Sequence, residues 1–373
     1  MKILYLANVR LPTEKAHGIQ IMETCAALAA SGHEVTLAVS AAHSSDEAPI
    51  FSYYGLPRTF SIRLMRGGGL LYWRTIGFIL GSFLFAWNIK HTFSFKAYDA
   101  VYTRDDILVR HGFFYEIHDV RKGPFQRRAL ARAAGVVAIT RGLVDYCRSI
   151  GVDESKIIVA PDGVDVEKFR IVESKEDCRS KVGLPADKKI VLYVGHLSLW
   201  KGADVLARAT ASLGDDVLVV FVGGNAAEVL SFKARIMSPR DSASYDDRMS
   251  FVGYQSREFV PYYLKAADVL VLPNSGKEVV SRLYTSPMKL FEYMVSGVPI
   301  VASDLPSIRE VLNDETAILV RPDDSESLAV GLRRVLEDPA GAAKLATVAA
   351  AVAGRYDWNK RAEHIIRFMA SLS

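Results

Sequence analysis

The chain has 373 residues, of which 50% are apolar and 24% charged, with 46 Lys and Arg against 42 Asp and Glu. This length predicts two domains, each with a sizeable apolar core. The near balance of charge, without a basic stripe interleaved with aromatic residues or a zinc module, argues against a nucleic-acid partner. Three cysteines, Cys25, Cys147 and Cys178, have spacings that fit no metal site, and their small number indicates reduced thiols in a cytoplasmic protein.

The N-terminus begins directly on an apolar run, without the basic region and long apolar core of a signal peptide. Short apolar runs then alternate with helical stretches along the whole chain. Most runs are continuous in Val, Ile and Leu, which is typical of parallel strands buried on both faces and joined by helical crossovers. The predicted strands are Lys2–Val9, His33–Val39, Ala100–Thr103, Phe114–Ile117, Val136–Ile139, Ile157–Ala160, Lys189–Gly195, Val217–Gly223, Phe251–Tyr254, Val269–Pro273, Pro299–Ala302 and Thr316–Val320.

The longest apolar run, Thr75–Trp87, is too short to span a bilayer comfortably. We predict a buried helix of an α/β domain, and the alternative is a helix that also touches a membrane interface. Residues 1–170 carry 21 Lys and Arg against 16 Asp and Glu, whereas the remainder carries 25 against 26. The first half is therefore the better candidate for meeting an anionic or lipid-linked acceptor at the inner face of a membrane. A basic cluster in this half, whose alternative is simple solvation, consists of Arg121, Lys122, Arg127, Arg128 and Arg132.

A turn-rich segment, Pro161–Asp165, separates the two sets of predicted strands. We therefore predict an α/β protein with two doubly wound sheets, residues 1–165 and residues 166–355, and a closing amphipathic helix in residues 356–373. Ligands of such sheets bind beyond the carboxyl ends of the strands. Residues that follow strands are therefore the candidates for function, and they include His118, His196 and Tyr254.

The segment Tyr284–Asp304 carries the strongest functional signal, because it predicts a helix whose N-terminus can hold an anion. Ser286 is a good N-cap residue, and Pro287 then occupies the first helical position. With the hydroxyl of Thr285, the free N–H groups and the helix dipole form a candidate phosphate site. Glu292 lies about two turns further along, where its carboxylate can accept hydrogen bonds from the two hydroxyls of a ribose. The pattern indicates a nucleotide, and the alternative is an ordinary capped helix with a surface glutamate.

Taken in order, these residues resemble the GT-B glycosyltransferases of the large retaining group called family 4. The resemblance covers nearly the full length and is most specific in four segments, Val194–Gly202, Phe251–Tyr254, Ala267–Pro273 and Ser286–Asp304. It implies two Rossmann-like domains that face a cleft, with the last helix crossing back to the first domain. It also implies a nucleotide-sugar donor and a saccharide or lipid-linked acceptor, in the synthesis of a cell-surface polysaccharide or glycolipid.

The resemblance also assigns roles to the donor site. Lys201 keeps the position of a lysine that binds the donor diphosphate, whereas His196 replaces the arginine that accompanies it. Glu292 matches the second glutamate of the family's E-x7-E motif and would bind the ribose. Tyr284 replaces the first glutamate, which leaves direct carboxylate contact with the sugar in doubt, and Thr285 and Ser286 offer hydroxyls toward the phosphate. Met288 and Lys289, in the first turn of the same helix, complete this part of the predicted site.

Further roles come from the same resemblance. Tyr254 would lie by the nucleobase, and the alternative is a tyrosine of the core. His118 would lie near the transferred sugar and act in catalysis together with Lys201 and His196, whereas the alternative is a histidine that satisfies a buried turn. Gly18 would let the loop before the first helix approach the diphosphate closely.

The chain has no clear Asp-x-Asp motif in a loop, and no nucleophile–base pair of the triad kind. We therefore expect no metal and no cofactor apart from the nucleotide sugar as co-substrate. Lys201, His196 and the helix N-terminus would meet the charge of the departing diphosphate. The alternatives are a nucleotide-sugar epimerase on the same fold and a non-catalytic nucleotide-sugar binder. A dehydrogenase is disfavoured, because no G-x-G-x-x-G motif follows the first strand.

Overall fold

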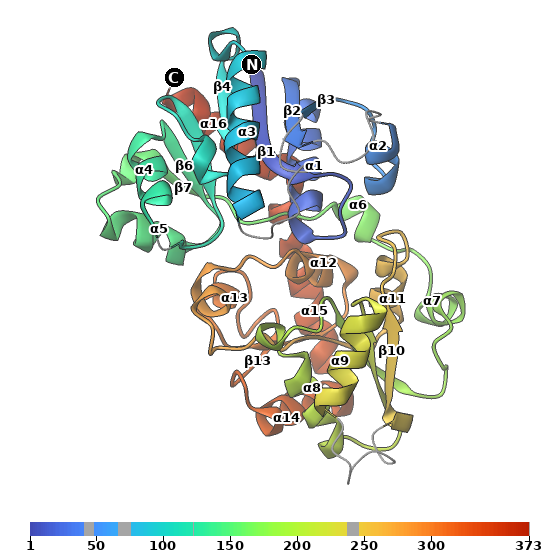
Figure 1. Cartoon of the computed structure of the whole chain (residues 1–373). Coiled ribbons are helices and arrows are strands. Elements are labelled where there is room, and N and C mark those ends of the chain that lie inside the picture. Colours follow the sequence, from blue (N-terminus) through green and yellow to red (C-terminus); the bar gives the residue numbers. More distant parts are fainter. Residues whose placement is uncertain (41–47, 66–75, 122, 237–245, 373) are drawn as a thin grey trace. The chain divides into compact units, whose positions relative to one another are not determined.

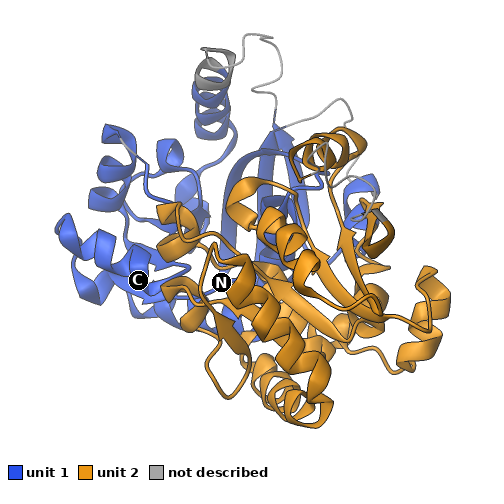
Figure 2. Ribbon diagram, turned by 90° about the horizontal axis from the view of Figure 1, so that it is seen from below, with its two compact units in different colours: residues 1–163, 358–373 blue, residues 164–357 orange. Residues whose placement is uncertain are grey.

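The computed structural model describes residues 1–40, 48–65, 76–121, 123–236 and 246–372. It divides into two compact units, residues 1–163 with 358–373, and residues 164–357 (Figure 2). Each unit is an α/β domain built on one parallel sheet, which confirms the predicted fold class. Among the described residues, no helix combines the length and the apolar character needed to cross a membrane.

The first unit contains a seven-stranded parallel sheet in the order β3-β2-β1-β4-β5-β6-β7. Its strands are β1 (Lys2–Arg10), β2 (Glu34–Ser40), β3 (Ser61–Met65), β4 (Ala100–Thr103), β5 (Phe113–Ile117), β6 (Gly135–Ala138) and β7 (Ile157–Val159). Its helices are α1 (Ala16–Ala30), α2 (Ala48–Tyr54), α3 (Ile76–Thr92), α4 (Pro124–Arg132), α5 (Arg141–Ser149) and α16 (Trp358–Ser371). The last helix, red in Figure 1, packs against α1 and β6, as predicted for a helix that returns to the first domain.

The second unit contains a six-stranded parallel sheet in the order β10-β9-β8-β11-β12-β13. Its strands are β8 (Lys189–Val194), β9 (Val217–Val222), β10 (Met249–Gly253), β11 (Val269–Leu272), β12 (Ile300–Ser303) and β13 (Ile318–Val320). Its helices are α6 (Val166–Phe169), α7 (Lys175–Val182), α8 (Ala203–Ala209), α9 (Ala226–Ile236), α11 (Val260–Ala266), α12 (Met288–Ser296), α13 (Pro306–Arg309), α14 (Ser325–Glu337) and α15 (Pro339–Ala353).

Burial on both faces explains why the strands read as continuous apolar runs. In β8, Ile190 and Leu192 pack into one core of the second unit, whereas Val191 and Tyr193 pack into the core on the opposite face. Successive side chains of a strand point to opposite faces, so both sets must be apolar. The strand Ser61–Met65 was not predicted, because it pairs only with β2 and alternates exposed and buried residues.

The predicted helix Thr75–Trp87 is only partly buried. Thr75 and the side chains of residues 76–80 lie outside the description. Further along, Phe85 is fully buried, whereas Phe83, Leu84 and Trp87 are 49%, 47% and 58% exposed. The interpretation of this helix as simple core is therefore wrong for one of its faces.

Candidate functional site

The carboxyl edge of the second sheet gathers most of the predicted donor-site residues. The strand order reverses between β8 and β11, which are neighbours in the sheet although β9 and β10 lie between them in sequence. After β8 the chain passes His196 and enters a short 3₁₀ turn, Leu199–Lys201, and after β11 it passes Asn274. Ligands of doubly wound sheets bind at such a switch point.

Two glycines let these loops meet. A Cβ atom at Gly202 would lie 1.7 Å from the carbonyl oxygen of Pro273, and the φ angle of +72° also favours glycine. A Cβ atom at Gly223 would lie 2.5 Å from the carbonyl oxygen of Gly195. The turn that carries Lys201 therefore packs directly on the end of β11, and the ends of β8 and β9 are in close contact.

Lys201 is a half-buried cation without a carboxylate partner among the described residues. Its Nζ lies 3.7 Å from the ring centroid of Trp200, a cation–π contact. Burial lowers the pKa of Lys201 to about 8.

Lys289, the second residue of α12, is a second cation at this edge. Its Nζ has no hydrogen-bond partner among the described residues and lies 4.2 Å from the ring centroid of Tyr193. Burial lowers the pKa of Lys289 well below its usual value, the ammonium group of Lys201 lowers it further, and Glu292 opposes both effects. Two positive groups thus share one desolvated region.

Asn274 adds an unpartnered amide at the end of β11. Its side chain is fully buried, and neither Oδ1 nor Nδ2 has a hydrogen-bond partner among the described residues. Buried polar atoms normally find partners, so such an exception needs an explanation, and an absent ligand is one. Sequence analysis missed Asn274, although its place directly after a predicted strand was a usable signal.

The start of α12 differs from the prediction. The helix begins at Met288 with Pro287 as its N-cap residue, and no side chain caps it there. The prediction of Ser286 as the N-cap and Pro287 as the first helical residue was therefore wrong by one position. The physical reason is that Pro287 adopts an extended ψ angle of 118°, which delays the first helical turn. A π-helical turn, Val280–Tyr284, precedes this loop and was not predicted.

The structure places Tyr284 and Thr285 in that preceding turn. Tyr284 is its last residue and Thr285 its C-cap residue. Both are half-buried, as are Ser286 and Met288. Single π-helical turns are rare and recur at functional sites, but no sequence pattern indicated this one. The roles assigned to these four residues stay predictions.

Glu292 is a buried residue and not a surface glutamate, since only 13% of its side chain is exposed. Its Oε1 lies 3.8 Å from Nη2 of Arg257, which follows β10 in the chain. Burial raises the pKa of Glu292, and Arg257 and Lys289 oppose that shift. Arg257 was missed by sequence analysis, although it stands three residues after the predicted site residue Tyr254. Tyr254 is 48% exposed, which contradicts its reading as a core tyrosine.

His196 faces a carboxylate. Its Nδ1 lies 3.4 Å from Oε1 of Glu228, which belongs to α9, and its side chain is 54% exposed. The hydroxyl of Tyr193 donates to the backbone carbonyl oxygen of His196 at 2.6 Å and so fixes the loop. The predicted pair of diphosphate-binding cations is therefore unequal, because Lys201 is half-buried and has no carboxylate partner among the described residues, whereas His196 has an acidic neighbour.

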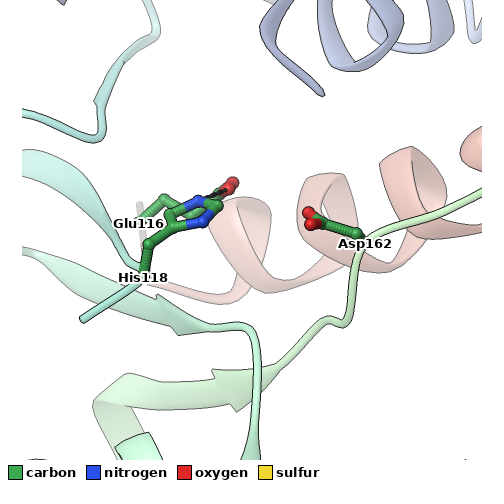
Figure 3. A group of neighbouring side chains, drawn as sticks. All are labelled: Glu116, His118 and Asp162. Carbon is green, nitrogen blue, oxygen red and sulfur yellow. Dashed lines mark hydrogen bonds and ion pairs between the residues drawn. The ribbon is translucent and has the colours of Figure 1, made fainter. Parts of the chain in front are cut away.

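His118 lies at the carboxyl edge of the other sheet, in the first unit. Its Nε2 is 2.5 Å from Oε1 of Glu116, a residue of β5 that is fully buried. Asp162 approaches the same pair, and Figure 3 shows its carboxylate turned toward them across a gap. The reading of His118 as a histidine that only satisfies a turn does not describe this geometry, because its partner is a buried carboxylate.

His17 and Gly18 stand near the start of α1. Burial, followed by the nearby charge of Arg104, lowers the pKa of His17 to about 4. A Cβ atom at Gly18 would lie 2.5 Å from both the Thr13 side chain and the Tyr54 hydroxyl. Packing against these two residues is sufficient reason for a glycine, and its approach to a diphosphate stays a prediction.

Comparison with known proteins agrees with this architecture. Residues 174–352 match the family model described as glycosyl transferases group 1, and residues 18–168 match the model described as glycosyltransferase family 4. The fold is shared over the whole of both chains with the Anabaena protein HepE in complex with UDP, at 18% identity and a TM-score of 0.75. The chain therefore belongs to the glycosyltransferase families of group 1 and family 4 and has the GT-B fold.

Two curated bacterial relatives resemble this GT-B glycosyltransferase over part of their length. A Bacillus subtilis protein named as a teichuronic acid biosynthesis glycosyltransferase, TuaC, is 28% identical over 233 residues, which are 61% of this chain and 54% of the relative. The D-inositol 3-phosphate glycosyltransferase of Xylanimonas cellulosilytica is 28% identical over 244 residues, which are 64% of this chain and 57% of the relative. The aligned region thus spans about half the length of each relative.

Proposed function

We propose that this GT-B glycosyltransferase moves a sugar from a nucleotide-sugar donor to an acceptor, with retention of the anomeric configuration. We further propose a role in the synthesis of a cell-surface polysaccharide or glycolipid. Two comparisons support the proposal. HepE, which shares the fold, has been crystallised with UDP-glucose, and TuaC is named for the biosynthesis of teichuronic acid.

The observation that carries the proposal is the pair of ammonium groups of Lys201 and Lys289, whose charged forms burial disfavours. A desolvated charge is costly unless an opposite charge compensates it, and here the second positive charge adds to the cost. Two adjacent positive charges suit the two phosphates of a nucleoside diphosphate. Lys289 stands three positions before Glu292 on α12, where it can supply the charge that the histidine at position 196 supplies less well.

Glu292 fits the ribose on chemical grounds. An ionised carboxylate accepts hydrogen bonds only, and two vicinal hydroxyls are two donors on adjacent carbons. Arg257 at 3.8 Å favours the ionised form of Glu292, although burial favours the neutral one. Phosphate contacts near the start of α12 and ribose contacts one turn further along would align a nucleotide with this helix.

The proposal includes that no divalent metal is needed. In many phosphate-transferring sites a metal ion neutralises the leaving group, and here Lys201, Lys289 and the α12 N-terminus would take that part. Protonated lysine would then stabilise the charge that develops as the glycosidic bond breaks.

The test is a thermal-shift panel of UDP-, GDP- and ADP-sugars on the wild type and on Lys201→Met and Lys289→Met. A ligand at about 100 times its Kd stabilises the native state by about 2.7 kcal/mol, so one donor should raise Tm by several degrees in the wild type only. Lys344→Met is the matched control, because that exposed lysine lies on α15, away from the sheet edge. A panel without any shift, or an equal shift in both site variants, would contradict the proposal.

Retention needs a separate measurement. Slow hydrolysis of the bound donor without acceptor releases the sugar, and its first-formed anomer is visible by NMR before mutarotation. A retaining enzyme releases the anomer that has the configuration of the donor. Release of the opposite anomer would contradict the proposed retention of configuration but not the proposed binding of a nucleotide sugar.

We also propose that the first unit meets its acceptor at an anionic membrane surface. On α3, Phe83, Leu84 and Trp87 are exposed, and on α4 the guanidinium groups of Arg127 and Arg128 are exposed and form no ion pair among the described residues. Both helices pack against the same 3₁₀ turn, Asp106–Leu108, so these side chains belong to neighbouring elements. Exposed aromatic groups beside arginines suit the boundary between headgroups and acyl chains.

The rest of the predicted basic cluster contributes less to that surface. Arg121 pairs with Asp106 and Asp119, so its charge is partly compensated, and Arg132 is half-buried. Lys122 lies outside the described residues. The proposed membrane contact therefore rests on Arg127 and Arg128 together with the exposed face of α3.

A further inference from the structure

The strand β5 ends with two side chains that act on each other. Glu116 and His118 are two residues apart, so their side chains lie on the same face of the sheet. Nε2 of His118 lies 2.5 Å from Oε1 of Glu116, and the two groups are drawn side by side in Figure 3. The Glu116 side chain is fully buried, and only 17% of the His118 side chain is exposed.

Glu116 receives donors on both of its oxygens. Oε1 also accepts from Nε2 of Gln20 at 2.5 Å. Oε2 accepts from the hydroxyl of Tyr102 and forms an ion pair of 3.0 Å with Nη2 of Arg361. Burial alone would raise the pKa of Glu116, but Arg361 and the hydrogen bond from His118 outweigh it and hold the pKa well below its usual value. Glu116 is therefore an ionised carboxylate inside the domain.

Arg361 reaches this carboxylate from the other end of the chain. It belongs to α16, and only 3% of its side chain is exposed. Its Nε donates to the carbonyl oxygen of Pro161 at 2.7 Å, and its Nη1 donates to Oγ1 of Thr24 at 3.3 Å. Main-chain and side-chain acceptors thus fix the guanidinium from several directions, so that its charge cannot turn away from Glu116.

An ionised carboxylate dictates the tautomer of the histidine that contacts it. Such a carboxylate can only accept hydrogen bonds, so Nε2 of His118 must carry a proton. The other ring nitrogen, Nδ1, is then the atom left for a ligand, as an acceptor when the ring is neutral. Asp162, Arg104 and His17 also lie near this edge of the sheet: Asp162 lies within 4.8 Å in the same cluster, and Arg104 donates to Oε1 of Gln20. Burial lowers the pKa of His17, and the charges of Arg104, Lys15 and His118 lower it further.

We propose that the Glu116–Arg361 ion pair is a positioning device for His118. The last helix supplies Arg361, Arg361 keeps Glu116 ionised, and Glu116 holds the ring orientation and the Nε2–H tautomer of His118. One part of this proposal rests on the proposed function, namely that His118 contacts the transferred sugar. Glu116 and Arg361 act through His118 and do not touch the substrate themselves.

A metal ion is the competing explanation of this cluster. Glu116, His118 and Asp162 each offer one ligand atom within 4.8 Å of the others. However, both Glu116 oxygens already accept hydrogen bonds, and the guanidinium of Arg361 already supplies the positive charge. A divalent cation would have to displace that network, so we propose no metal site at this cluster.

The experiment uses the double variant E116Q/R361M in the full chain. Removing one partner of a buried ion pair strands the other charge, whereas removing both leaves a neutral site of similar volume that usually folds. In the double variant His118 loses its carboxylate, so kcat should fall at least about tenfold, as expected when a reacting group is misplaced, while the donor KM changes less than about twofold. In the H118A background the same double change should alter kcat by less than about twofold, because coupled residues are not additive.

A second readout needs no turnover. In protein labelled with ¹⁵N-histidine, the ring nitrogens of His118 should report the Nε2–H tautomer in the wild type and a mixture of tautomers in E116Q/R361M. R361K is the control variant, because it keeps a positive charge beside Glu116, so Glu116 should stay ionised and the Nε2–H tautomer should be retained. An unchanged tautomer in E116Q/R361M, or an equal loss of kcat in the H118A background, would overturn the proposal. Absence of transferase activity in the wild type would refute the proposed function alone, since the tautomer result stands without it.

Discussion

At the scale of single residues, Lys201 and Lys289 of the second unit link the stability of the free protein to the binding of an anionic ligand. Lys201 and Lys289 have lowered pKa values because burial disfavours their charged forms. Neither has a carboxylate within ion-pair distance among the described residues, although Glu292 acts on Lys289 from further away. An arrangement of this kind reduces the stability of the free protein, and a bound anion relieves the cost.

The first prediction concerns the substitution Lys289→Met. The free protein should gain unfolding free energy, because methionine removes a desolvated ammonium group that has no hydrogen-bond partner among the described residues. The same variant should lose about tenfold or more in nucleotide-sugar affinity, as expected for a charged hydrogen bond worth about 1.5–3 kcal/mol. Urea unfolding and calorimetric titration give the two quantities. A variant that is less stable than the wild type would show that the Nζ group has a partner in the free protein.

The second prediction concerns pH. Lys201 has a pKa of about 8 in the folded chain and about 10.4 in an unfolded one. Between these values the unfolded state holds more protons, so the contribution of Lys201 to the stability of the free protein should rise with pH from about 8 to about 10.4. Donor affinity should change in the opposite direction and fall above pH 8, because the neutral amine of Lys201 does not attract a diphosphate. Affinity measured at pH 7 and 9 in Lys201→Arg should vary less, since arginine stays charged.

At the scale of secondary-structure elements, α3 and α12 show how a helix can serve two environments. The α12 helix buries Leu290, Phe291, Tyr293 and Met294, while its first turn carries Lys289 to the sheet edge. The α3 helix buries Phe85 and Ile89 and leaves three apolar side chains in solvent. Exposed groups of that kind gathered on one helix are typical of an interaction surface.

The third prediction tests the proposed membrane contact of α3 and α4. Anionic vesicles should bind the wild type, whereas vesicles of neutral lipid should bind it weakly. R127E/R128E should abolish the salt-sensitive part of the binding, because each basic residue near an anionic leaflet contributes about 1 kcal/mol. W87S should weaken binding at all salt concentrations, because its effect is apolar. R334E/R355E is the matched control, because it makes the same charge change at two exposed arginines of the second unit. No sedimentation with anionic vesicles at low salt would end the membrane proposal.

At the scale of the whole molecule, α16 ties the C-terminus to the first unit. Phe368 packs edge-on against Phe114, and a Cβ atom at Gly135 would lie 2.7 Å from its ring. Trp358, Ile365 and Met369 of the same helix are also buried. The first unit is therefore incomplete without the last residues of the chain.

The fourth prediction follows from that packing. Phe368→Ala should destabilise the first unit by about 3–5 kcal/mol, the usual cost of removing a buried aromatic side chain. Lys360→Ala, an exposed residue on the same helix, should change stability by less than about 0.5 kcal/mol. Hydrogen exchange resolves the effect by unit, and the amides of β8 to β13 should keep their protection. Equal loss of protection in both sheets would show that the two units unfold as one.

The fifth prediction concerns metal dependence. Sugar transfer should persist after dialysis against EDTA, because the proposed function assigns the neutralisation of the diphosphate to the two lysines. Magnesium or manganese added back should change kcat by less than about twofold, whereas a metal-dependent leaving group would lose several kcal/mol of stabilisation. Turnover abolished by EDTA and restored by either ion would contradict this prediction.

Sequence alone determined the architecture, because parallel strands buried on both faces must be apolar at every position, as in Val217–Val222. It also located Lys201, Glu292 and His118 beside the strand ends where ligands bind. Their roles toward a donor sugar stay predictions. The sequence could not show the edge strand Ser61–Met65 or the π-helical turn, since neither has a distinctive local pattern.

Tertiary structure decided which charges meet. Arg361 pairs with Glu116, and Arg257 with Glu292, across long stretches of chain. Lys289 reaches Tyr193 and the surroundings of Lys201 only because β8 and the loop before α12 end at the same sheet edge. Local sequence sets the conformation of each segment, but partners so far apart are fixed by the crossovers and the strand order. Burial, and with it the pKa of each lysine, is a property of that assembled environment and not of the residue.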